Sequence, residues 1–275
     1  MSLKFFKYHG CGNDYVYIDC FKNEVRNPKI LSKQISKQHF GVGSDGLILI
    51  CPSSLADAKI RIFNANGSEA TMCGNGIRCT AKYLFDEKIV CKHDFNIETL
   101  SGIKNVKILK NSKILSIVKV NMGLPNFEVN CKNNRKKIID FPFKIGANIY
   151  RITYVSIGNP HCVIFSSDIE KVNIEYLSNS IQNSGLFLED VNFEFVEINS
   201  RNSINMRVWE RGSGETLACG TGACASVVAA VENNMCDRNV TVNLRGGRLL
   251  IEYDHDVVFM TGEAVKVFEG KMEES

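Results

Sequence analysis

The sequence predicts an α+β protein with two pseudosymmetric domains from an internal duplication, each a sheet wrapped around a central helix. Three observations support this class. One set of residues recurs at a constant spacing of 146 positions, each half contains short apolar runs that are typical of strands, and each half contains one amphipathic helical stripe. A chain of 275 residues is also long enough for two domains that each bury a core.

The repeat keeps a single register along much of the chain. The matched pairs are Gly12-Asn13 with Gly158-Asn159, Arg61 with Arg207, Glu69 with Glu215, Cys73-Gly74 with Cys219-Gly220, and Gly76 with Gly222. An apolar strand pattern precedes each Cys-Gly-x-Gly turn. Chance rarely preserves one spacing across so many residue types, so we interpret the chain as two copies of one domain.

The expected elements follow in the same order in each half. Apolar runs predict strands at 47–51, 59–63, 114–120, 204–209, 240–244 and 249–253. Stripes with the spacing i, i+4, i+7, i+8 predict the central helices, and they consist of Ile77, Ala81, Leu84 and Phe85 in the first half and Ala223, Val227, Ala230 and Val231 in the second.

The domain boundary is expected where Met122-Gly123-Leu124-Pro125 interrupts the strand pattern. The first domain then covers residues 1–121 and carries Cys73, and the second covers residues 122–262 and carries Cys219. The last expected strand, 264–268, could belong to either domain, so residues 263–275 could complete the first one.

The composition is that of an ordinary soluble globular protein, with 44% hydrophobic and 23% charged residues. Its net charge of +3 is small and spread along the chain, so we expect no nucleic-acid partner. No window approaches the ~18 consecutive apolar residues of a membrane helix, and the first ten residues lack the apolar stretch of a secretory signal. We therefore expect a cytoplasmic protein with no membrane partner.

The cysteines are numerous but do not form a recognisable framework. There are 11 of them, without any Cys-x-x-Cys pair, and their odd number and uneven spacing do not resemble a disulfide pattern. Structural zinc sites usually draw their ligands from close Cys or His pairs. We therefore expect reduced thiols and no metal site.

Cys73 and Cys219 stand apart because each comes just before an expected central helix. Unpaired backbone N–H groups and the helix dipole favour negative charge there, and the flanking glycines allow a ligand carboxylate to approach. If a pseudo-twofold relates the two turns, the thiols would face each other across the domain cleft. One could then remove a proton from a carbon while the other returns one from the opposite face, without a cofactor. The alternative is two buried small apolar residues, the usual role of a free cysteine.

Longer motifs occur in both halves of the chain. They are Gly10-Cys11-Gly12-Asn13-Asp14, Phe63-Asn64-Ala65-Asn66-Gly67-Ser68, Met72-Cys73-Gly74-Asn75-Gly76-Ile77-Arg78-Cys79, Gly158-Asn159-Pro160-His161-Cys162-Val163, Glu210-Arg211-Gly212-Ser213-Gly214-Glu215-Thr216 and Ala218-Cys219-Gly220-Thr221-Gly222. With the ending Val267-Phe268-Glu269-Gly270, they closely resemble the diaminopimelate epimerase family over nearly the whole chain. The resemblance implies a pyridoxal-independent, cofactor-free homodimer that interconverts LL- and meso-diaminopimelate for lysine and peptidoglycan synthesis.

Matched position by position, the resemblance also implies roles for single residues. Cys73 and Cys219 match the catalytic pair, one a thiolate base and the other a thiol acid, which exchange roles with direction. His161 and Glu210 match residues near the thiols, where they could orient or tune the pair. The backbone amides of the two turns match those that hold the carboxylate at the reacting centre, and the turn residues are Gly74, Asn75, Gly220 and Thr221.

The substrate-binding set implied by the resemblance is Asn13, Asn64, Asn159, Asn192 and Arg211. Arg211 is suited to the distal carboxylate, since a guanidinium group binds a carboxylate through two hydrogen bonds. At two positions the chain differs from some family members: Thr71 replaces an acidic residue, and Gly46 replaces a substrate-contacting Gln. The fine substrate contacts at these two positions stay open.

Plainer interpretations exist for several of these residues. Asparagines beside glycine often form turns, His161 could be a satisfied core histidine, and Glu210 with Arg211 could be a solvated charge pair. A proline or hydroxyproline racemase is the nearest rival function, but its cyclic substrate has no second carboxylate for Arg211 to hold. A non-catalytic thiol-rich redox or metal-binding module is the rival outside enzymes.

Overall fold

The computed structural model describes residues 2–131 and 134–273, and these fall into two compact units. Unit 2 spans Met122–Met260, and unit 1 comprises the described residues on either side of it. Among the described residues, no helix combines the length and the apolar character needed to cross a membrane.

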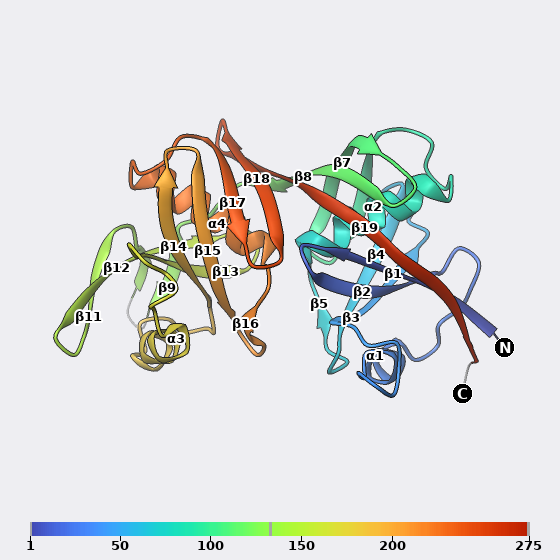
Figure 1. Cartoon of the computed structure of the whole chain (residues 1–275), viewed down its shortest axis with the longest axis horizontal. Helices are drawn as coiled ribbons and strands as arrows, with labels where there is room; N and C mark the ends of the chain where they lie inside the picture. The colour runs from blue at the N-terminus through green and yellow to red at the C-terminus, as the bar shows by residue number, and fades with distance from the viewer. Residues whose placement is uncertain (1, 132–133, 274–275) are drawn as a thin grey trace. The chain divides into compact units, whose positions relative to one another are not determined.

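Unit 1 surrounds the central helix α2 (Gly74–Asp86) with strands and has one further helix, α1 (Pro28–Ile35). Its strands are β1 (Ser2–Gly10), β2 (Asn13–Asp19), β3 (Gly46–Cys51), β4 (Ala58–Asn64), β5 (Glu69–Ala70), β6 (Asp94–Thr99), β7 (Gly102–Asn111), β8 (Leu115–Gly123) and most of β19 (Val257–Glu273). The two ends of the chain lie side by side here, because β1 pairs antiparallel with β19 and Leu3 lies opposite Met272 (Figure 1).

Unit 2 has the same plan around its central helix α4 (Gly220–Glu232), with a further helix α3 (Ile174–Asn183). Its strands are β9 (Glu128–Cys131), β10 (Asn134–Lys137), β11 (Phe141–Ile145), β12 (Asn148–Ser156), β13 (Pro160–Phe165), β14 (Asn192–Ser200), β15 (Ser203–Glu210), β16 (Gly214–Thr216), β17 (Asn239–Leu244) and β18 (Gly247–Asp254). Strands β9 and β10 form a separate hairpin.

The strand pairing repeats between the units. In unit 1, β2 runs parallel to β3, and β4 pairs antiparallel with β3 and β5 and parallel with β6. In unit 2, β13 runs parallel to β14, and β15 pairs antiparallel with β14 and β16 and parallel with β17. Equivalent registers are Tyr15–Gly46 with His161–Asn192, and Phe63–Glu69 with Trp209–Glu215. Each of these residues matches its counterpart at the spacing of 146, so the repeat in the sequence is a repeat in the structure.

The central helices are buried along most of their length. Every residue from 74 to 84 in α2 and from 220 to 230 in α4 is buried. A helix that is buried all round must satisfy its polar side chains internally, and Lys82 does so by donating to the Ser112 carbonyl at 2.8 Å and pairing with Asp86 at 2.8 Å. The predicted fold class, a sheet around a central helix in each half, is confirmed.

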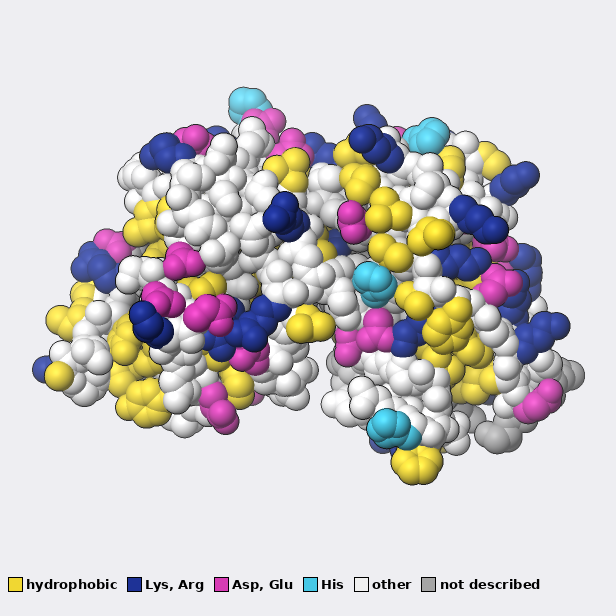
Figure 2. Space-filling model, in the orientation of Figure 1, with side chains coloured by type: hydrophobic (Ala, Val, Ile, Leu, Met, Phe, Trp, Pro, Cys, Tyr) yellow, Lys and Arg dark blue, Asp and Glu magenta, His cyan; other side chains and the backbone are white. Residues whose placement is uncertain are grey.

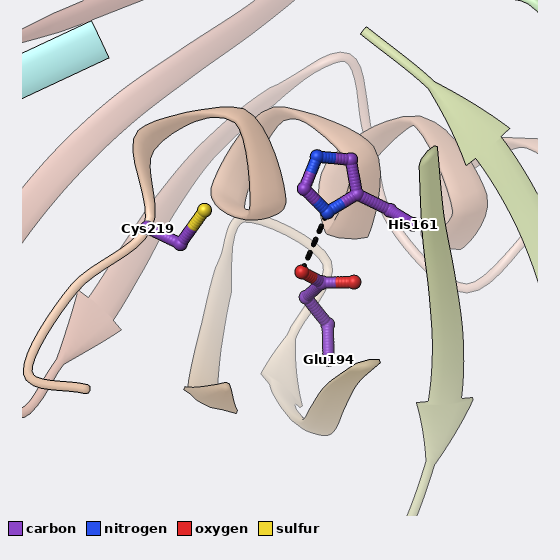
Figure 3. A group of neighbouring side chains, drawn as sticks. All are labelled: His161, Glu194 and Cys219. Atoms are coloured by element: carbon purple, nitrogen blue, oxygen red, sulfur yellow. Dashed lines mark hydrogen bonds and ion pairs between the residues drawn. The ribbon is translucent and has the colours of Figure 1, made fainter. Parts of the chain in front are cut away.

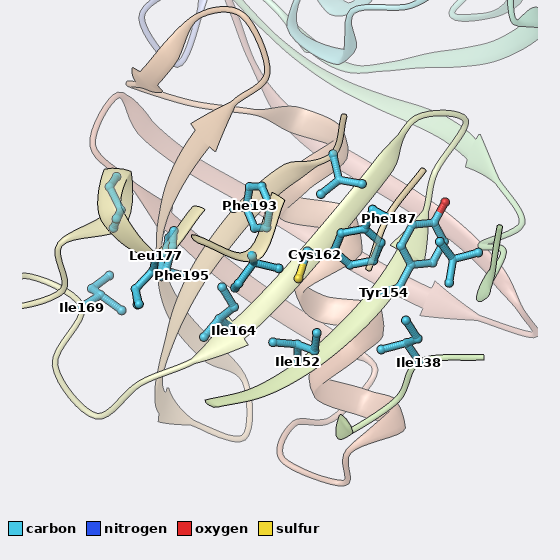
Figure 4. Close-up of a cluster of buried hydrophobic side chains, with 14 residues drawn as sticks. Ile138, Ile152, Tyr154, Cys162, Ile164, Ile169, Leu177, Phe187, Phe193 and Phe195 are labelled. Carbon is cyan, nitrogen blue, oxygen red and sulfur yellow. The ribbon is translucent and has the colours of Figure 1, made fainter. Parts of the chain in front are cut away.

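A second core in each unit lies between the sheet and the outer helix. In unit 2, Ile164, Phe193 and Phe195 pack with Leu177 of α3 in the cluster drawn in Figure 4. In unit 1, Val16, Leu49 and Phe63 belong to a similar cluster that includes Ile35 at the end of α1. The strands therefore have apolar layers on both faces. The two cysteine turns follow the short strands β5 and β16, which pair with β4 and β15.

Candidate active site

Cys73 caps the N-terminus of α2. Its backbone is extended, with φ −141° and ψ 113°, and its Sγ accepts a hydrogen bond from the Gly76 N–H at 3.3 Å. Glycine at position 76 allows this close approach, because a Cβ there would lie 3.4 Å from Cys73 Sγ and 2.6 Å from Ile48 Cδ1. The sulfur thus sits where the free N–H groups of a helix favour negative charge.

Amide side chains surround Cys73 in unit 1. Asn13 Oδ1 accepts from the Cys73 thiol at 3.4 Å and from Asn75 Nδ2 at 3.3 Å. Asn13 Nδ2 in turn donates to Asp45 Oδ2 at 2.6 Å. Burial raises the pKa of the Asp45 carboxyl, while hydrogen bonds from the Asp14 backbone and Asn13 oppose the rise. The asparagines are therefore held in one orientation beside the sulfur.

Arg78 holds the first turn of α2 in place through hydrogen bonds. Its side chain is fully buried, and its guanidinium donates to Asn75 Oδ1 at 2.7 Å and to the Gly74 carbonyl at 3.1 Å. It also donates to the Glu263 carbonyl at 3.3 Å, which ties the turn to β19. A planar guanidinium with several donors suits this bridging position.

A two-bond ion pair precedes each cysteine turn. Arg61 of β4 binds both carboxylate oxygens of Glu69 at 2.8 and 3.1 Å, and Arg207 of β15 binds both oxygens of Glu215 at 2.8 and 3.0 Å. These four residues are among those matched by the repeat. The pairs close the hairpins that lead into Cys73 and Cys219, which gives them a positioning role.

Asn64 and Gly46 lie opposite each other where β4 and β3 pair. The Asn64 amide donates to Ser68 Oγ at 3.0 Å, within the turn before Cys73. A Cβ on Gly46 would lie 2.1 Å from the Phe63 carbonyl oxygen, so the backbone here leaves no space for a longer side chain. Thr71, the other departure from the family pattern, is exposed.

Cys219 caps α4 in the same way as Cys73 caps α2, with φ −123° and ψ 115° and its Sγ accepting from the Gly222 N–H at 3.4 Å. Thr221 Oγ1 lies 3.4 Å from the same sulfur. The surroundings differ, since Cys219 is only 7% exposed whereas Cys73 is half-buried. Burial raises the pKa of the Cys219 thiol well above its usual range, and the charges of Glu210 and Glu194 raise it further.

Glu210 ends β15 close to Cys219. It accepts a hydrogen bond from the Thr216 hydroxyl, which lies across the β15–β16 hairpin. Burial raises the pKa of the Glu210 carboxyl, and hydrogen bonds from Thr216 and from the Cys219 thiol partly offset that rise. Cys219 therefore keeps its proton beside a carboxyl group.

His161 and Glu194 form a buried pair next to Cys219 (Figure 3). His161 Nδ1 lies 2.7 Å from Glu194 Oε1, and both side chains are 0% exposed. His161, Glu194 and Cys219 each offer one possible ligand atom, and these atoms lie within 4.8 Å of one another. Among the residues that the structure describes, this group has the spacing that a metal ion would need.

Asn192 at the start of β14 bonds to the start of β13 and to the residue that follows β15. Its Oδ1 accepts from the Arg211 backbone N–H at 3.0 Å, and its Nδ2 donates to the Pro160 carbonyl at 3.4 Å. The Arg211 side chain is exposed and donates to the Asp190 carbonyl at 3.3 Å. Asn159 lies in the turn between β12 and β13, where its carbonyl accepts from the Ile157 N–H at 3.2 Å.

The family model described as Diaminopimelate epimerase matches residues 5–128 and 153–267 of this sequence. The chain belongs to the diaminopimelate epimerase family. Similar proteins include the curated diaminopimelate epimerase of Acetivibrio thermocellus, 46% identical over 98% of this chain and 99% of the relative. That of Methanococcus maripaludis is 44% identical over 98% of this chain and 100% of the relative.

Solved structures share the fold of this diaminopimelate epimerase family member at low sequence identity. A phenazine biosynthesis protein of the PhzF family from Bacillus anthracis superposes with a TM-score of 0.73 at 16% identity and full coverage of both chains. A hydroxyproline epimerase from Agrobacterium vitis superposes with a TM-score of 0.71 at 11% identity, covering 98% of this chain and 91% of that one. At such identities the likeness concerns the fold alone.

The expected site residues of this family member fall into two groups, one in each unit. Unit 1 holds Cys73, Gly74, Asn75, Asn13 and Asn64, and unit 2 holds Cys219, Gly220, Thr221, His161, Glu210, Asn159, Asn192 and Arg211. Three residues in contact with these groups were not predicted: Asp45, Arg78 and Glu194. Glu194 had no clear signal, because its alternation with Phe193 and Phe195 is typical of a strand with one exposed face.

Proposed function

We propose that this chain is a cofactor-free epimerase that interconverts LL- and meso-diaminopimelate, with Cys73 and Cys219 as the acid–base pair. Family membership supports the substrate. One observation carries the mechanism: the duplicated halves present equivalent cysteines, each of which caps a buried helix. The sulfur of each accepts a hydrogen bond from the backbone N–H of a glycine three positions later in the sequence, at 3.3 Å in unit 1 and 3.4 Å in unit 2. Inversion at a carbon needs a base and an acid on opposite faces, and a duplicated thiol supplies both.

The different surroundings of the two thiols support a division of labour in the resting enzyme. Cys73, half-buried at a helix N-terminus, is the base that takes the substrate α-proton. Cys219, whose pKa is raised by burial and by nearby carboxyl groups, is the acid that donates a proton to the same carbon. After one turnover the protonation states are reversed, which is the state needed for the opposite direction.

The remaining residues suit binding and positioning. The first-turn N–H groups of Gly74, Asn75, Gly220 and Thr221 are donors for the carboxylate at the reacting carbon. The exposed Arg211 guanidinium suits the distal carboxylate, because its fork can make two parallel hydrogen bonds.

The asparagines and charged residues of the proposed site either contact the substrate or position and tune other groups. Asn13, Asn64 and Asn159 contribute amide groups for substrate contacts. Asn192 holds the backbone of Arg211 in place. His161 and Glu210 surround Cys219 and tune its proton affinity.

The test is conversion of LL-diaminopimelate by the purified chain without added pyridoxal phosphate or metal, followed by chiral chromatography. Appearance of the meso isomer, with no racemisation of proline or 4-hydroxyproline, supports the proposal. Racemisation of proline or 4-hydroxyproline without action on diaminopimelate would replace it with the rival racemase, and bound metal without any racemisation would favour a binding module.

We infer that the enzyme works in the cytoplasm as a homodimer. Exposed apolar side chains of unit 1 support self-association: Ile114, Val267 and Phe268 are 63%, 53% and 44% exposed. The Lys266 N–H donates to the Ile114 carbonyl at 2.8 Å, which brings Ile114 beside β19. Hydrophobic side chains follow the path of β19 in Figure 2. Light scattering after size exclusion tests this, with a mass of twice 30.7 kDa expected and a single-chain mass contradicting it.

A further inference from the structure

The two helix N-termini differ at one pair of equivalent positions. Ile48 in unit 1 and Glu194 in unit 2 are related by the spacing of 146, and each lies against the third residue of its central helix. A Cβ built on Gly76 would lie 2.6 Å from Ile48 Cδ1, and a Cβ built on Gly222 would lie 2.5 Å from Glu194 Oε1. An apolar side chain therefore packs at the start of α2, and a carboxyl group packs at the start of α4.

Glu194 carries a carboxyl group that is buried and only partly hydrogen-bonded. It is 0% exposed between the buried residues Phe193 and Phe195, and its Oε2 has no hydrogen-bond partner among the described residues. Its Oε1 contacts His161 Nδ1 at 2.7 Å. Burying a carboxyl group with only one hydrogen-bond partner lowers the free energy of unfolding. An apolar residue at the same place, such as Ile48 in unit 1, carries no such penalty. Buried carboxyl groups of this kind concentrate at functional sites.

The position of Glu194 affects Cys219 through the helix. The N-terminus of a helix carries partial positive charge that stabilises a nearby anion. At α4 this charge is shared between the Glu194 carboxyl group and Cys219 Sγ, which accepts the Gly222 N–H. A second negative charge at the same helix end is repelled, so the carboxyl group favours the protonated form of Cys219.

We propose that Glu194 is a positioning residue that holds His161 through Nδ1 and keeps Cys219 as the proton-donating thiol of the resting enzyme. This rests on the proposed function, in which one thiol is the base and the other the acid. Ile48, at the equivalent place beside Gly76, brings no charge to the start of α2. The duplicated halves thereby differ in the side chain packed at the helix N-terminus although their backbones match.

Other groups also act on Cys219 and set the size of the expected effect. Glu210 faces it from β15, His161 from β13 and Glu194 from β14, and the Thr221 hydroxyl and Gly222 N–H belong to α4 itself. Burial and Glu210 raise the pKa of Cys219 more than Glu194 does. Removing the Glu194 charge should therefore lower this pKa in part.

The experiment measures the pH dependence of iodoacetamide alkylation at each cysteine by peptide mass spectrometry. Glu194→Gln keeps the shape and an acceptor for His161 but removes the charge, and Glu194→Ile copies the unit 1 residue. The matched control is Glu197→Gln on the same strand, whose carboxylate accepts from Asn205 Nδ2 at 2.8 Å. Far-UV circular dichroism and Trp209 fluorescence establish which variants fold, and one folded Glu194 variant is enough.

We expect the alkylation midpoint of Cys219 to fall by about one pH unit in the Glu194 variants, which means about tenfold faster alkylation below the midpoint. Cys73 and the Glu197→Gln protein should react as in the wild type, and the basic limb of the kcat/KM profile should move to lower pH only in the Glu194 variants. An unchanged Cys219 midpoint, or an equal shift at Cys73, would overturn the proposal. Alkylation needs no substrate, so a wild type without epimerase activity would refute the proposed function separately.

Discussion

Replacing Gly222 by alanine tests how tightly the Glu194 carboxyl group is packed against α4. The new Cβ would lie 2.5 Å from Glu194 Oε1 and 3.1 Å from Glu194 Cδ, so the carboxyl group must move. The change gains at most about 1 kcal/mol of helix propensity. Displacement of the buried carboxyl group from His161 costs about 1.5–3 kcal/mol, the value of a hydrogen bond to a charged group. The net expectation is a loss of about 0.5–2 kcal/mol in the free energy of unfolding.

Urea unfolding followed by Trp209 fluorescence measures this loss, because the single tryptophan lies in β15 of unit 2. With a slope of about 2 kcal/mol/M, the midpoint should fall by about 0.25–1 M. Gly76→Ala is the matched control: its Cβ clashes with the flexible end of the Ile48 side chain, and its 3.4 Å distances to Cys73 Cβ and Sγ are ordinary contacts. Rotation of Ile48 costs about 0.5–1.5 kcal/mol and is offset by helix propensity. Its unfolding, followed by circular dichroism, should stay close to the wild type. A Gly222→Ala protein as stable as the wild type would refute the close packing of Glu194.

Further predictions concern the proposed site. Cys73→Ala and Cys219→Ala should each lower epimerisation by about 10²–10⁴-fold with unchanged circular dichroism, and wild-type turnover of either would exclude the two-thiol mechanism. Arg211→Lys should lower kcat/KM for diaminopimelate by about ten- to hundredfold through loss of the two-bond contact, and an unchanged value would remove Arg211 from the distal carboxylate. Because burial raises the pKa of Glu210, its protonated form is favoured by folding. Glu210→Gln should therefore raise the urea midpoint at pH 7, and this gain should disappear as the pH falls below about 4.3, where the unfolded glutamate is protonated; a gain that persists there would contradict the raised pKa.

The repeat explains why so much of the fold could be predicted. Residues at the spacing of 146 include the ion pairs Arg61–Glu69 and Arg207–Glu215, and the structure shows that both pairs close equivalent hairpins. The predicted strand 59–63 lies inside β4, and the predicted strand 114–120 begins one residue before β8. One local difference concerns β8, which continues to Gly123, past the expected interruption of the pattern at Met122. The strand simply continues until the glycine with φ +92° ends it.

The outer helices were not predicted, for different physical reasons. In α1 only Ser32 and Ile35 are buried, so its sequence lacks a strong apolar stripe. In α3 the stripe exists, because Ile174, Leu177 and Ile181 follow the cap residue Asn173, which accepts from the Tyr176 N–H. The second helix could therefore have been found from its periodicity and its cap.

The site was predicted less completely than the fold. Motifs identified the turns that carry Cys73 and Cys219, since glycines at fixed positions leave a clear pattern. Glu194 could not be placed from alternation, because its strand has apolar layers on both faces and neither face is polar. The spacing of 146 pairs Glu194 with Ile48, but only the packing against Gly222 reveals what the carboxyl group touches.

The most direct test of the two-thiol account is the position of deuterium in early turnover. LL-diaminopimelate is incubated in deuterated water without added cofactor, and substrate and product are separated and analysed by mass spectrometry. If Cys73 removes the α-proton and a solvent-exchanged Cys219 donates from the opposite face, deuterium appears first at the α-carbon of the meso product, while recovered LL substrate stays unlabelled. Deuterium in the recovered substrate from the first turnovers, as a single base would give, would contradict the account.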